Sequence, residues 1–303
     1  MSLIYFGTGS FALPALRALA DSVALVVTQP DRPSGRGMRL QPSPVKLLAQ
    51  ELGIPVETPE KSRAPEFLET LLAVHADALV VASYGQILSQ KVLDSARCGG
   101  INLHGSILPQ YRGAAPIQRC ILNGDTETGI TIMQMDKGMD TGDIIEIVRT
   151  PIDPDETYGE LQDRLAIIAS ALAVDWMPKI IAGQYTRQAQ DGSLATIAPK
   201  IDKAEAELSV LRSAVGEYNR FRAFTPAPGA FLRTNLGTIR VQEARLVPLS
   251  GDPGAVLSTS PFTVAFQDGA IQLLQVQPEG KKRMSGKDFA NGARMKPGSR
   301  LVD

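Results

Sequence analysis

The fold class is decided by residues 3–19, LIYFGTGSFALPALRAL. Four apolar residues, Leu3–Phe6, come first and predict a buried strand. A glycine-rich turn, Gly7–Gly9, follows directly. Apolar residues then recur with helical spacing over Phe11–Leu19. A strand, a tight turn and a helix in this order are typical of the first unit of an α/β domain.

Further apolar runs of the same kind recur along the first half of the chain. They are Val23–Thr28, Ala78–Ala82, Ile101–His104, Ile130–Met135 and Ile144–Val148. Continuous β-branched runs separated by helical patterns are typical of strands that are buried on both faces of a parallel sheet. We therefore predict a doubly wound, mostly parallel, Rossmann-like sheet for this part of the chain.

The second half of the chain changes character after one long helix. Helical periodicity is strong over Glu156–Ala182, and Pro178 predicts that this helix breaks or ends nearby. A helical stretch, Leu208–Phe221, comes next. Short strands are then expected at Ala230–Leu232, Thr238–Val241, Ala255–Leu257, Thr263–Phe266 and Ile271–Val276. Their even spacing predicts a small β-barrel or sandwich, and we favour an OB-like barrel.

The predicted organisation is two domains joined by a linker. The α/β domain covers residues 1–183, the polar and turn-rich linker 184–205, and the β-barrel 206–303. Residues 204–303 carry 13 Lys/Arg and 9 Asp/Glu, and seven of these basic residues lie within Lys281–Arg300. The whole chain has a net charge of −1, so its front part is acidic. This asymmetry indicates different partners for the two ends, with a plain solvated surface as the alternative.

The cellular compartment is predicted from what the sequence lacks. Two cysteines, Cys98 and Cys120, have no metal-like spacing and do not suggest a disulfide framework, which fits a reducing compartment. No apolar run reaches the length that spans a membrane, and the N-terminus does not read as a signal peptide. We therefore expect a cytoplasmic protein.

The glycine-rich turn also raises a nucleotide-binding alternative. Residues 7–12, GTGSFA, match G-x-G-x-x-A between a strand and a helix, and Asp31 is the acid that could hold a ribose. However, Asp31 lies in a proline-rich loop beyond the next strand, and Phe11 resembles a packing residue. We favour the interpretation that the glycines serve close packing of the turn.

Two polar residues lie on one face of a predicted strand. Asn102 and His104 are two positions apart, so their side chains point to the same side, while Ile101 and Leu103 point to the other. The carboxyl ends of parallel strands are where ligands bind in open α/β sheets. A satisfied polar pair in the core is the alternative interpretation.

An acidic loop could complete this site. Residues 135–143, MDKGMDTGD, place three acids and two glycines between two apolar strands. An EF-hand needs a different spacing and a closing glutamate, so calcium is not favoured, and a plain acidic turn remains possible. A loop at a strand end could deliver one carboxylate to a histidine on a neighbouring strand.

An ordered set of motifs resembles the folate-dependent formyltransferases. The motifs are Asn102-x-His104-x-Ser106, Leu108-Pro109-x-x-Arg112-Gly113 and Asp136-x-Gly138-x-Asp140-x-Gly142. Other stretches resemble the members that act on initiator tRNA: residues 29–37, 42–46, 222–226 and 280–284. The resemblance runs from about residue 3 to residue 301. One departure is Ala227, where the family often has tryptophan, and it concerns only local packing of the second domain.

The resemblance implies a reaction that agrees with the chemistry of these side chains. The implied donor is 10-formyltetrahydrofolate, the acceptor is the methionine amine on initiator tRNA, and the catalytic residues are Asn102, His104 and Asp140, without a metal. An amide N–H of Asn102 can stabilise the charge that develops on the formyl oxygen. The imidazole of His104 can move protons near neutral pH. Asp140 can orient that ring and favour its charged form.

Binding residues are implied by the same resemblance. For the folate they are Ser83, Tyr84, Gly85, Gln86, Ile87, Leu88, Ser106, Ile107, Leu108, Pro109, Asp136 and Gly138. Ordinary core packing remains an alternative for Tyr84 and Ile87. For the tRNA they are Arg32, Arg36, Arg39, Lys281, Lys282 and Arg283, which would position phosphates. We expect a monomer that needs no membrane.

Three other functions remain alternatives, and a different observation distinguishes each of them. The same chemistry on a small amine, such as a glycinamide ribonucleotide or an amino sugar, would not need the arginine-containing loop. A nicotinamide dehydrogenase would bind NADH saturably at the glycine-rich turn. A catalytically silent RNA-binding module would leave Asn102, His104 and Asp140 without a role.

Overall fold

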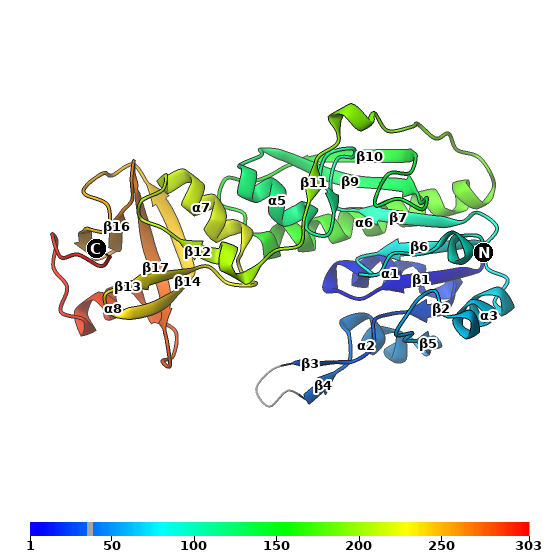
Figure 1. Cartoon of the computed structure of the whole chain (residues 1–303), viewed down its shortest axis with the longest axis horizontal. Helices are drawn as coiled ribbons and strands as arrows, with labels where there is room; N and C mark the ends of the chain where they lie inside the picture. The colour runs from blue at the N-terminus through cyan, green and yellow to red at the C-terminus, as the bar shows by residue number, and fades with distance from the viewer. Residues whose placement is uncertain (35–38, 303) are drawn as a thin grey trace. The chain divides into compact units, whose positions relative to one another are not determined.

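The computed structural model describes residues 1–34 and 39–302, and they form two compact units (Figure 1). The first unit is made of Met1–Pro116, Glu127–Thr150 and Gln162–Pro199. The second is made of Ile117–Thr126, Pro151–Leu161 and Lys200–Asp303. The second unit therefore takes two segments from the part of the chain before residue 162, which composition alone does not indicate. The predicted domain limits at residues 183 and 205 stay a prediction.

A seven-stranded sheet forms the centre of the first unit. Its strands, in spatial order, are β10 (Ile144–Pro151), β9 (Glu127–Gln134), β7 (Gly100–His104), β6 (Ala78–Ala82), β1 (Leu3–Gly7), β2 (Val23–Val27) and β5 (Val56–Glu57). All pairs from β7 to β5 are parallel, and β9 runs antiparallel to β7. The predicted mostly parallel, doubly wound sheet is confirmed.

The strand order places a ligand-binding edge next to β1. The chain passes from β1 to β2 and β5 on one side, and then returns to β6 and β7 on the other. Such a reversal leaves a crevice at the carboxyl ends of the strands, where ligands bind in sheets of this kind. Strands β1, β6 and β7 are fully buried, which explains the apolar sequences of β1 and β6.

Helices and short elements surround this sheet. They are α1 (Leu13–Leu19), α2 (Pro44–Glu51), α3 (Pro65–Ala73), α4 (Gln90–Leu93), α6 (Tyr158–Ile181), and the 3-10 turns Ser10–Ala12, Ala20–Ser22 and Gly192–Leu194. Helix α5 (Pro116–Asn123) belongs almost entirely to the second unit. Two small pairs complete the list: the hairpin β3 (Arg32–Ser34) and β4 (Arg39–Gln41), and the parallel pair β8 (Arg112–Gly113) and β11 (Ile197–Ala198).

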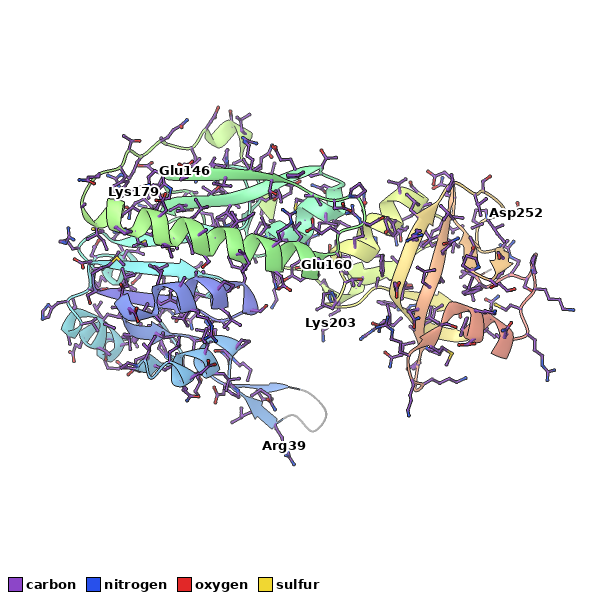
Figure 2. The ribbon with its side chains drawn as sticks, turned by 180° about the vertical axis from the view of Figure 1, so that it is seen from behind. Arg39, Glu146, Glu160, Lys179, Lys203 and Asp252 are labelled. Carbon is purple, nitrogen blue, oxygen red and sulfur yellow. The ribbon has the colours of Figure 1, made fainter. Side chains whose placement is uncertain are left out.

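Helix α6 ends close to Pro178, as the sequence predicts. It continues through Pro178 to Ile181, and Figure 2 shows it as one helix along which Glu160 and Lys179 mark the two ends. Leu161, Leu165 and Ala169 are buried along one of its faces. Because the proline lies in the last turn, it removes one backbone donor near the helix end and does not stop the helix at once. No helix in the described part of the chain is both long and apolar enough to span a membrane.

The second unit is built on an open β-sheet. Its order is β12 (Glu207–Leu208), β13 (Phe231–Thr234), β14 (Gly237–Val247), β17 (Ala270–Pro278), β16 (Phe262–Ala265) and β15 (Val256–Thr259), with β18 (Met284–Ser285) beside β17. The helices α7 (Ala214–Ala223) and α8 (Gly286–Gly292) and the 3-10 turn Lys203–Ala206 complete it. Leu208, expected in a helix, lies in β12.

Strand pairing does not close the predicted barrel among the described residues. Strands β12 and β15 are the two ends of the sheet. The C-terminal residues take the place of a closing strand, because Arg300 bridges to Ala255 beside β15 and Leu301 accepts a hydrogen bond from Asn235 N at 3.0 Å. The small β domain is confirmed, and C-terminal residues cover its β15 edge.

Arg222, the first residue of the stretch 222–226, has a structural role in the second unit. The Arg222 side chain is buried, and its guanidinium donates to the carbonyl oxygens of Asp153 and Glu156, each at 3.2 Å, and to Asn219 Oδ1 at 2.6 Å. These bonds tie the segment Pro151–Leu161 to α7 within the second unit. Burial lowers the pKa of Arg222, since desolvation disfavours the charged form.

Candidate active site

Asn102, His104 and Asp140 converge in the first unit. Asn102 and His104 lie two positions apart on β7 and are both buried, and Asp140 lies in the loop between β9 and β10. Asn102 Nδ2 donates to Asp140 Oδ1 at 3.2 Å, and His104 Nδ1 lies 3.7 Å from Asp140 Oδ2. The structure thus brings together an amide, an imidazole and a carboxylate that are far apart in sequence.

The orientation of the His104 ring follows from its second nitrogen. Nε2 lies 3.0 Å from the carbonyl oxygen of Tyr111. A carbonyl oxygen only accepts hydrogen bonds, so we assign the proton to Nε2. The other nitrogen, Nδ1, is then directed at the Asp140 carboxylate. In this tautomer Nδ1 carries the lone pair that can take up a proton.

Both carboxylate oxygens of Asp140 accept hydrogen bonds, and its backbone adopts an uncommon conformation. Gly113 N donates to Oδ2 at 2.8 Å, in addition to the bond from Asn102 to Oδ1. The φ angle of Asp140 is 53°, in the left-handed region, and Tyr111 has a φ of 61°. Residues that adopt such conformations without being glycine concentrate at functional sites, where the surrounding structure holds them.

The loop that follows β7 is pinned by a residue that sequence reasoning missed. Thr131 on β9 is buried, its Oγ1 donates to the carbonyl of Ser106 at 2.6 Å, and it accepts from Leu108 N at 3.1 Å. Ser106 Oγ in turn donates to the carbonyl of Gln110 at 2.7 Å. The available signal was a hydroxyl within an apolar strand. These bonds give the predicted folate residues Ser106–Pro109 a defined backbone.

The acidic loop is shaped by its own first carboxylate. Asp136 Oδ1 accepts from Gly138 N at 2.9 Å and from Thr141 Oγ1 at 2.7 Å. The carboxylate of Asp136 is therefore engaged within the turn, and the backbone of the loop is the part that a ligand can meet. The acidic-turn interpretation holds for Asp136, while Asp140 faces the histidine.

The predicted folate stretch 83–88 divides into core and exposed residues. Tyr84 is buried, its ring lies 5.1 Å from that of Phe6 in an edge-on contact, and burial raises its pKa to about 12. Leu88 belongs to the same core, whereas the Ile87 side chain is 76% exposed. Ile87 therefore does not pack in the core, and its apolar surface is available to a ligand.

Two other members of this stretch hold the loop in place. Gln86 Oε1 accepts from Ser62 N at 2.9 Å, and its Nε2 donates to the carbonyl of Pro59 at 3.3 Å. Ser83 and Gly85 both have positive φ, of 49° and 88°. The stretch lies at the carboxyl end of β6, where the sheet order reverses, and the carbonyl of Tyr84 accepts from Thr8 Oγ1 at 2.8 Å.

The geometry supports packing as the role of the glycine-rich turn. A Cβ at Gly7 would lie 2.9 Å from Ala12 Cβ and 2.9 Å from Tyr5 Cε1, so the position requires glycine for space alone. Asp31, the candidate ribose partner, accepts from Lys46 Nζ through both oxygens at 2.8 and 2.9 Å. Its carboxylate is engaged by a cation of α2.

The predicted tRNA residues lie on exposed surfaces of both units. Arg32 and Arg39 are the first residues of β3 and β4, and Figure 2 shows Arg39 projecting from the hairpin. Arg36 lies outside the described residues. In the second unit Lys281 and Lys282 are exposed, while Arg283 lies 3.5 Å from Glu243 Oε2 and 3.3 Å from Gln275 Oε1.

Gly142 is expected to be intolerant of any side chain. A Cβ at this position would lie 1.8 Å from the carbonyl oxygen of Gln134 and 3.0 Å from its carbon, and this neighbour is strand backbone. We expect Gly142→Ala to lower the free energy of unfolding by about 1–3 kcal/mol, measured by urea denaturation. Gly192→Ala is the control, because no atom lies within 4 Å of a Cβ there. Equal stability of the two variants would contradict the close approach.

Comparison with known proteins identifies the family of this fold. The family model for formyl transferase matches residues 2–177, and the model for the formyl transferase C-terminal domain matches residues 200–294. Among solved structures, the sugar 3N-formyl transferase WlaRD superposes with a TM-score of 0.66 at 19% identity, covering 93% of this chain and 99% of its own. An N-formyltransferase from Helicobacter canadensis also gives 0.66 at 19% identity, covering 89% and 98%. The chain belongs to the formyl transferase family.

Curated relatives narrow this assignment. The methionyl-tRNA formyltransferase of Geobacter metallireducens is 41% identical, over 99% of this chain and 98% of its own length. That of Chromobacterium violaceum is 44% identical, over 99% of both. Within the formyl transferases, the chain belongs with the methionyl-tRNA formyltransferases.

Proposed function

We propose that this chain transfers the formyl group of 10-formyltetrahydrofolate to the amino group of methionine on initiator methionyl-tRNA. The observation that carries the proposal is the contact of Asp140 with both Asn102 and His104. The full-length similarity to methionyl-tRNA formyltransferases supports this acceptor. The formylated product serves the initiation of translation.

Asn102 stabilises the charge that develops on the formyl oxygen. An asparagine amide has two N–H groups, and one of them is directed at Asp140 Oδ1. The second is available to the oxygen while the amine attacks the formyl carbon. Because Asn102 is buried and braced by Asp140, this donor is preorganised, and such donors contribute about 10²–10³ in rate.

His104 moves the proton between the two nitrogens. The new C–N bond leaves a surplus proton on the methionine nitrogen, and Nδ1 of His104 takes it as the general base. The same proton then goes to the folate nitrogen as the old C–N bond breaks, so the imidazole ends as it began. Between these steps the ring is an imidazolium, which the Asp140 carboxylate stabilises.

The folate is placed by backbone groups and apolar surface. Residues Ser106–Pro109, the stretch Ser83–Leu88 and the backbone of Asp136–Gly138 lie at loops that follow β7, β6 and β9 of one sheet. These loops are held by Thr131, Gln86 and Asp136, and they present an exposed apolar residue in Ile87. A flat pterin ring fits such a combination of main-chain polar groups and apolar contact.

No metal is assigned to this reaction. Among residues 1–34 and 39–302, no group of three or more His, Cys, Asp or Glu side chains is arranged to hold a metal ion. The Asn102 amide and the His104 imidazole supply the charge stabilisation and proton transfer that the proposed reaction needs.

Basic residues of the hairpin region and of the second unit bind the tRNA. Arg32, Arg36 and Arg39 of the hairpin region and Lys281, Lys282 and Arg283 of the second unit contact phosphates. In this assignment residues 1–183 are the catalytic domain, 184–205 a linker and 206–303 the tRNA-binding domain. The enzyme acts in the cytoplasm as a monomer.

Turnover on charged initiator tRNA, compared with turnover on small amines, tests the function. We expect formylation of the tRNA with 10-formyltetrahydrofolate and none of an amino sugar or glycinamide ribonucleotide. The reverse preference would favour the small-amine enzyme. Saturable binding of NADH, followed by fluorescence transfer, would favour a dehydrogenase.

Arg36→Ala is expected to weaken the use of tRNA without changing the folate. The expected result is a higher KM for initiator tRNA and an unchanged KM for 10-formyltetrahydrofolate, because an arginine–phosphate contact acts on the nucleic acid alone. Arg17→Ala is the control, since Arg17 is an exposed arginine of the same unit paired with Glu51. An equal effect of both variants would remove the special role of Arg36.

A further inference from the structure

The segment predicted as a linker contains a strap that lies on the first unit. We define the strap as residues 188–198 (Figure 1). At its start Gln188 bridges to Ile144 through two backbone hydrogen bonds of 2.8 and 2.9 Å. At its end β11 pairs with β8, where Arg112 N donates to the carbonyl of Thr196 and Ala114 N to that of Ala198, each at 2.9 Å. The strap therefore connects the start of β10 with the loop that follows His104.

Gln190 lies between these two attachments and makes four hydrogen bonds through its side chain. Its Nε2 donates to the carbonyl of Asp140 at 2.9 Å and to that of Gly142 at 2.7 Å. Its Oε1 accepts from Arg112 Nε at 3.0 Å and from Arg112 Nη2 at 2.7 Å. One amide thus satisfies two carbonyls of the acidic loop and both donors of a guanidinium edge.

The four bonds hold two segments that position the Asp140 carboxylate, the acidic loop and the loop that follows His104. On one side Gln190 holds the backbone of Asp140 itself, in a left-handed conformation that a non-glycine residue adopts at a cost. On the other side it holds Arg112, whose neighbour Gly113 donates its N–H to Asp140 Oδ2. Loss of the amide would release the two loops that direct this carboxylate at His104.

We propose that Gln190 is a positioning residue for Asp140, and through it for Asn102 and His104, in the formyl transfer proposed above. The inference rests on that proposed function. Gln190 itself touches no reacting atom, and its effect is on the geometry of the carboxylate. Displacing a catalytic group by about 1 Å costs on the order of 100-fold in rate.

Two variants of Gln190 and one control test this role on the full-length enzyme. Gln190→Leu keeps the size of the side chain and removes both donor and acceptor. Gln190→Glu keeps an acceptor for Arg112 and removes the donor to the two carbonyls. Gln188→Ala is the matched control, because Gln188 is an exposed glutamine of the same strap that bonds through its backbone.

The expected result is a split between kcat and KM. Both Gln190 variants should lower kcat for initiator tRNA by about 10–100-fold, with KM for the tRNA and the folate changed less than twofold. Each variant should still bind one tetrahydrofolate per chain, which shows that the loss does not come from an unfolded fraction. If Gln190→Leu does not fold, the kcat and KM of Gln190→Glu alone test the positioning role.

A double-mutant cycle separates positioning from a general structural role. In the Asp140→Asn background, Gln190→Leu should produce no further loss, since the carboxylate that it positions is already absent. Losses that multiply independently would overturn the inference. So would a kcat within twofold of the wild type, or a drop in activity matched by an equal drop in folate stoichiometry. Failure of the wild type and of Gln188→Ala to formylate tRNA would instead contradict the proposed function.

Discussion

Replacing Asp140 by alanine is expected to lower kcat for tRNA formylation several hundredfold while the protein stays folded. The carboxylate accepts hydrogen bonds from Asn102 Nδ2 and Gly113 N and faces His104 Nδ1. Its removal leaves the imidazolium without a counter-charge and the amide without a brace. One substitution thus weakens both catalytic functions without removing either group, and the expected loss lies within the range of about 10²–10⁴ that a single proton-transfer group contributes.

The neighbouring residue Asp143 provides the control for this variant. It lies three positions further along the same loop, and its carboxylate makes no hydrogen bond or ion pair within residues 1–34 and 39–302. Asp143→Ala should keep kcat within about twofold, as surface substitutions away from such features have small effects. Measurement of single-turnover formylation rates distinguishes the two. Similar losses in both variants would show that the loop matters only as a structure.

Replacing Asn102 by alanine is expected to lower kcat by about 10²–10³, the range observed when one oxyanion donor is removed. The amide N–H that stabilises the formyl oxygen is lost, and Asp140 Oδ1 loses its 3.2 Å partner. Asn102→Asp keeps the shape but replaces the donor by an acceptor that is negatively charged beside Asp140. We expect an even larger loss for Asn102→Asp, because two carboxylates then face each other.

The KM for 10-formyltetrahydrofolate separates this role from ground-state binding. A donor that acts on developing charge lowers kcat and kcat/KM equally and leaves KM unchanged. If Asn102→Ala raised the KM for the folate and left kcat intact, the amide would be a binding group. Activity near that of the wild type in Asn102→Asp would remove Asn102 from the mechanism.

Much of the site was predicted because its residue types are unusual in their setting. Asn102 and His104 are polar residues on a strand that is otherwise apolar, and strand periodicity places them on one face. Thr131 and Gln190 escaped notice for opposite reasons. Thr131 is one of two buried threonines in β9, and Gln190 lies in a stretch whose polar composition resembles a linker.

Tertiary contacts also decided between the alternative roles predicted for some residues. Ile87 and Tyr84 are both apolar or aromatic residues of one stretch, yet Tyr84 packs on Phe6 and Ile87 is exposed. Asp31 fits a ribose partner by spacing, but Lys46 from α2 occupies its carboxylate. In both cases the outcome depends on which distant side chain arrives, which local pattern does not encode.

The local patterns by themselves determined the longer strands of both units, the helices α1, α6 and α7, and the pair Asn102 and His104, because burial periodicity and backbone preferences act within a few residues. Asp140 was singled out from the three acids of its loop only by the resemblance to a known family. Only the tertiary structure decided that Asp140 meets His104 and that residues 188–198 lie on the first unit. It also decided that segments before residue 162 join the second unit. These contacts join residues 36 or more positions apart. They form because folding buries apolar surface and satisfies backbone groups across the whole chain at once.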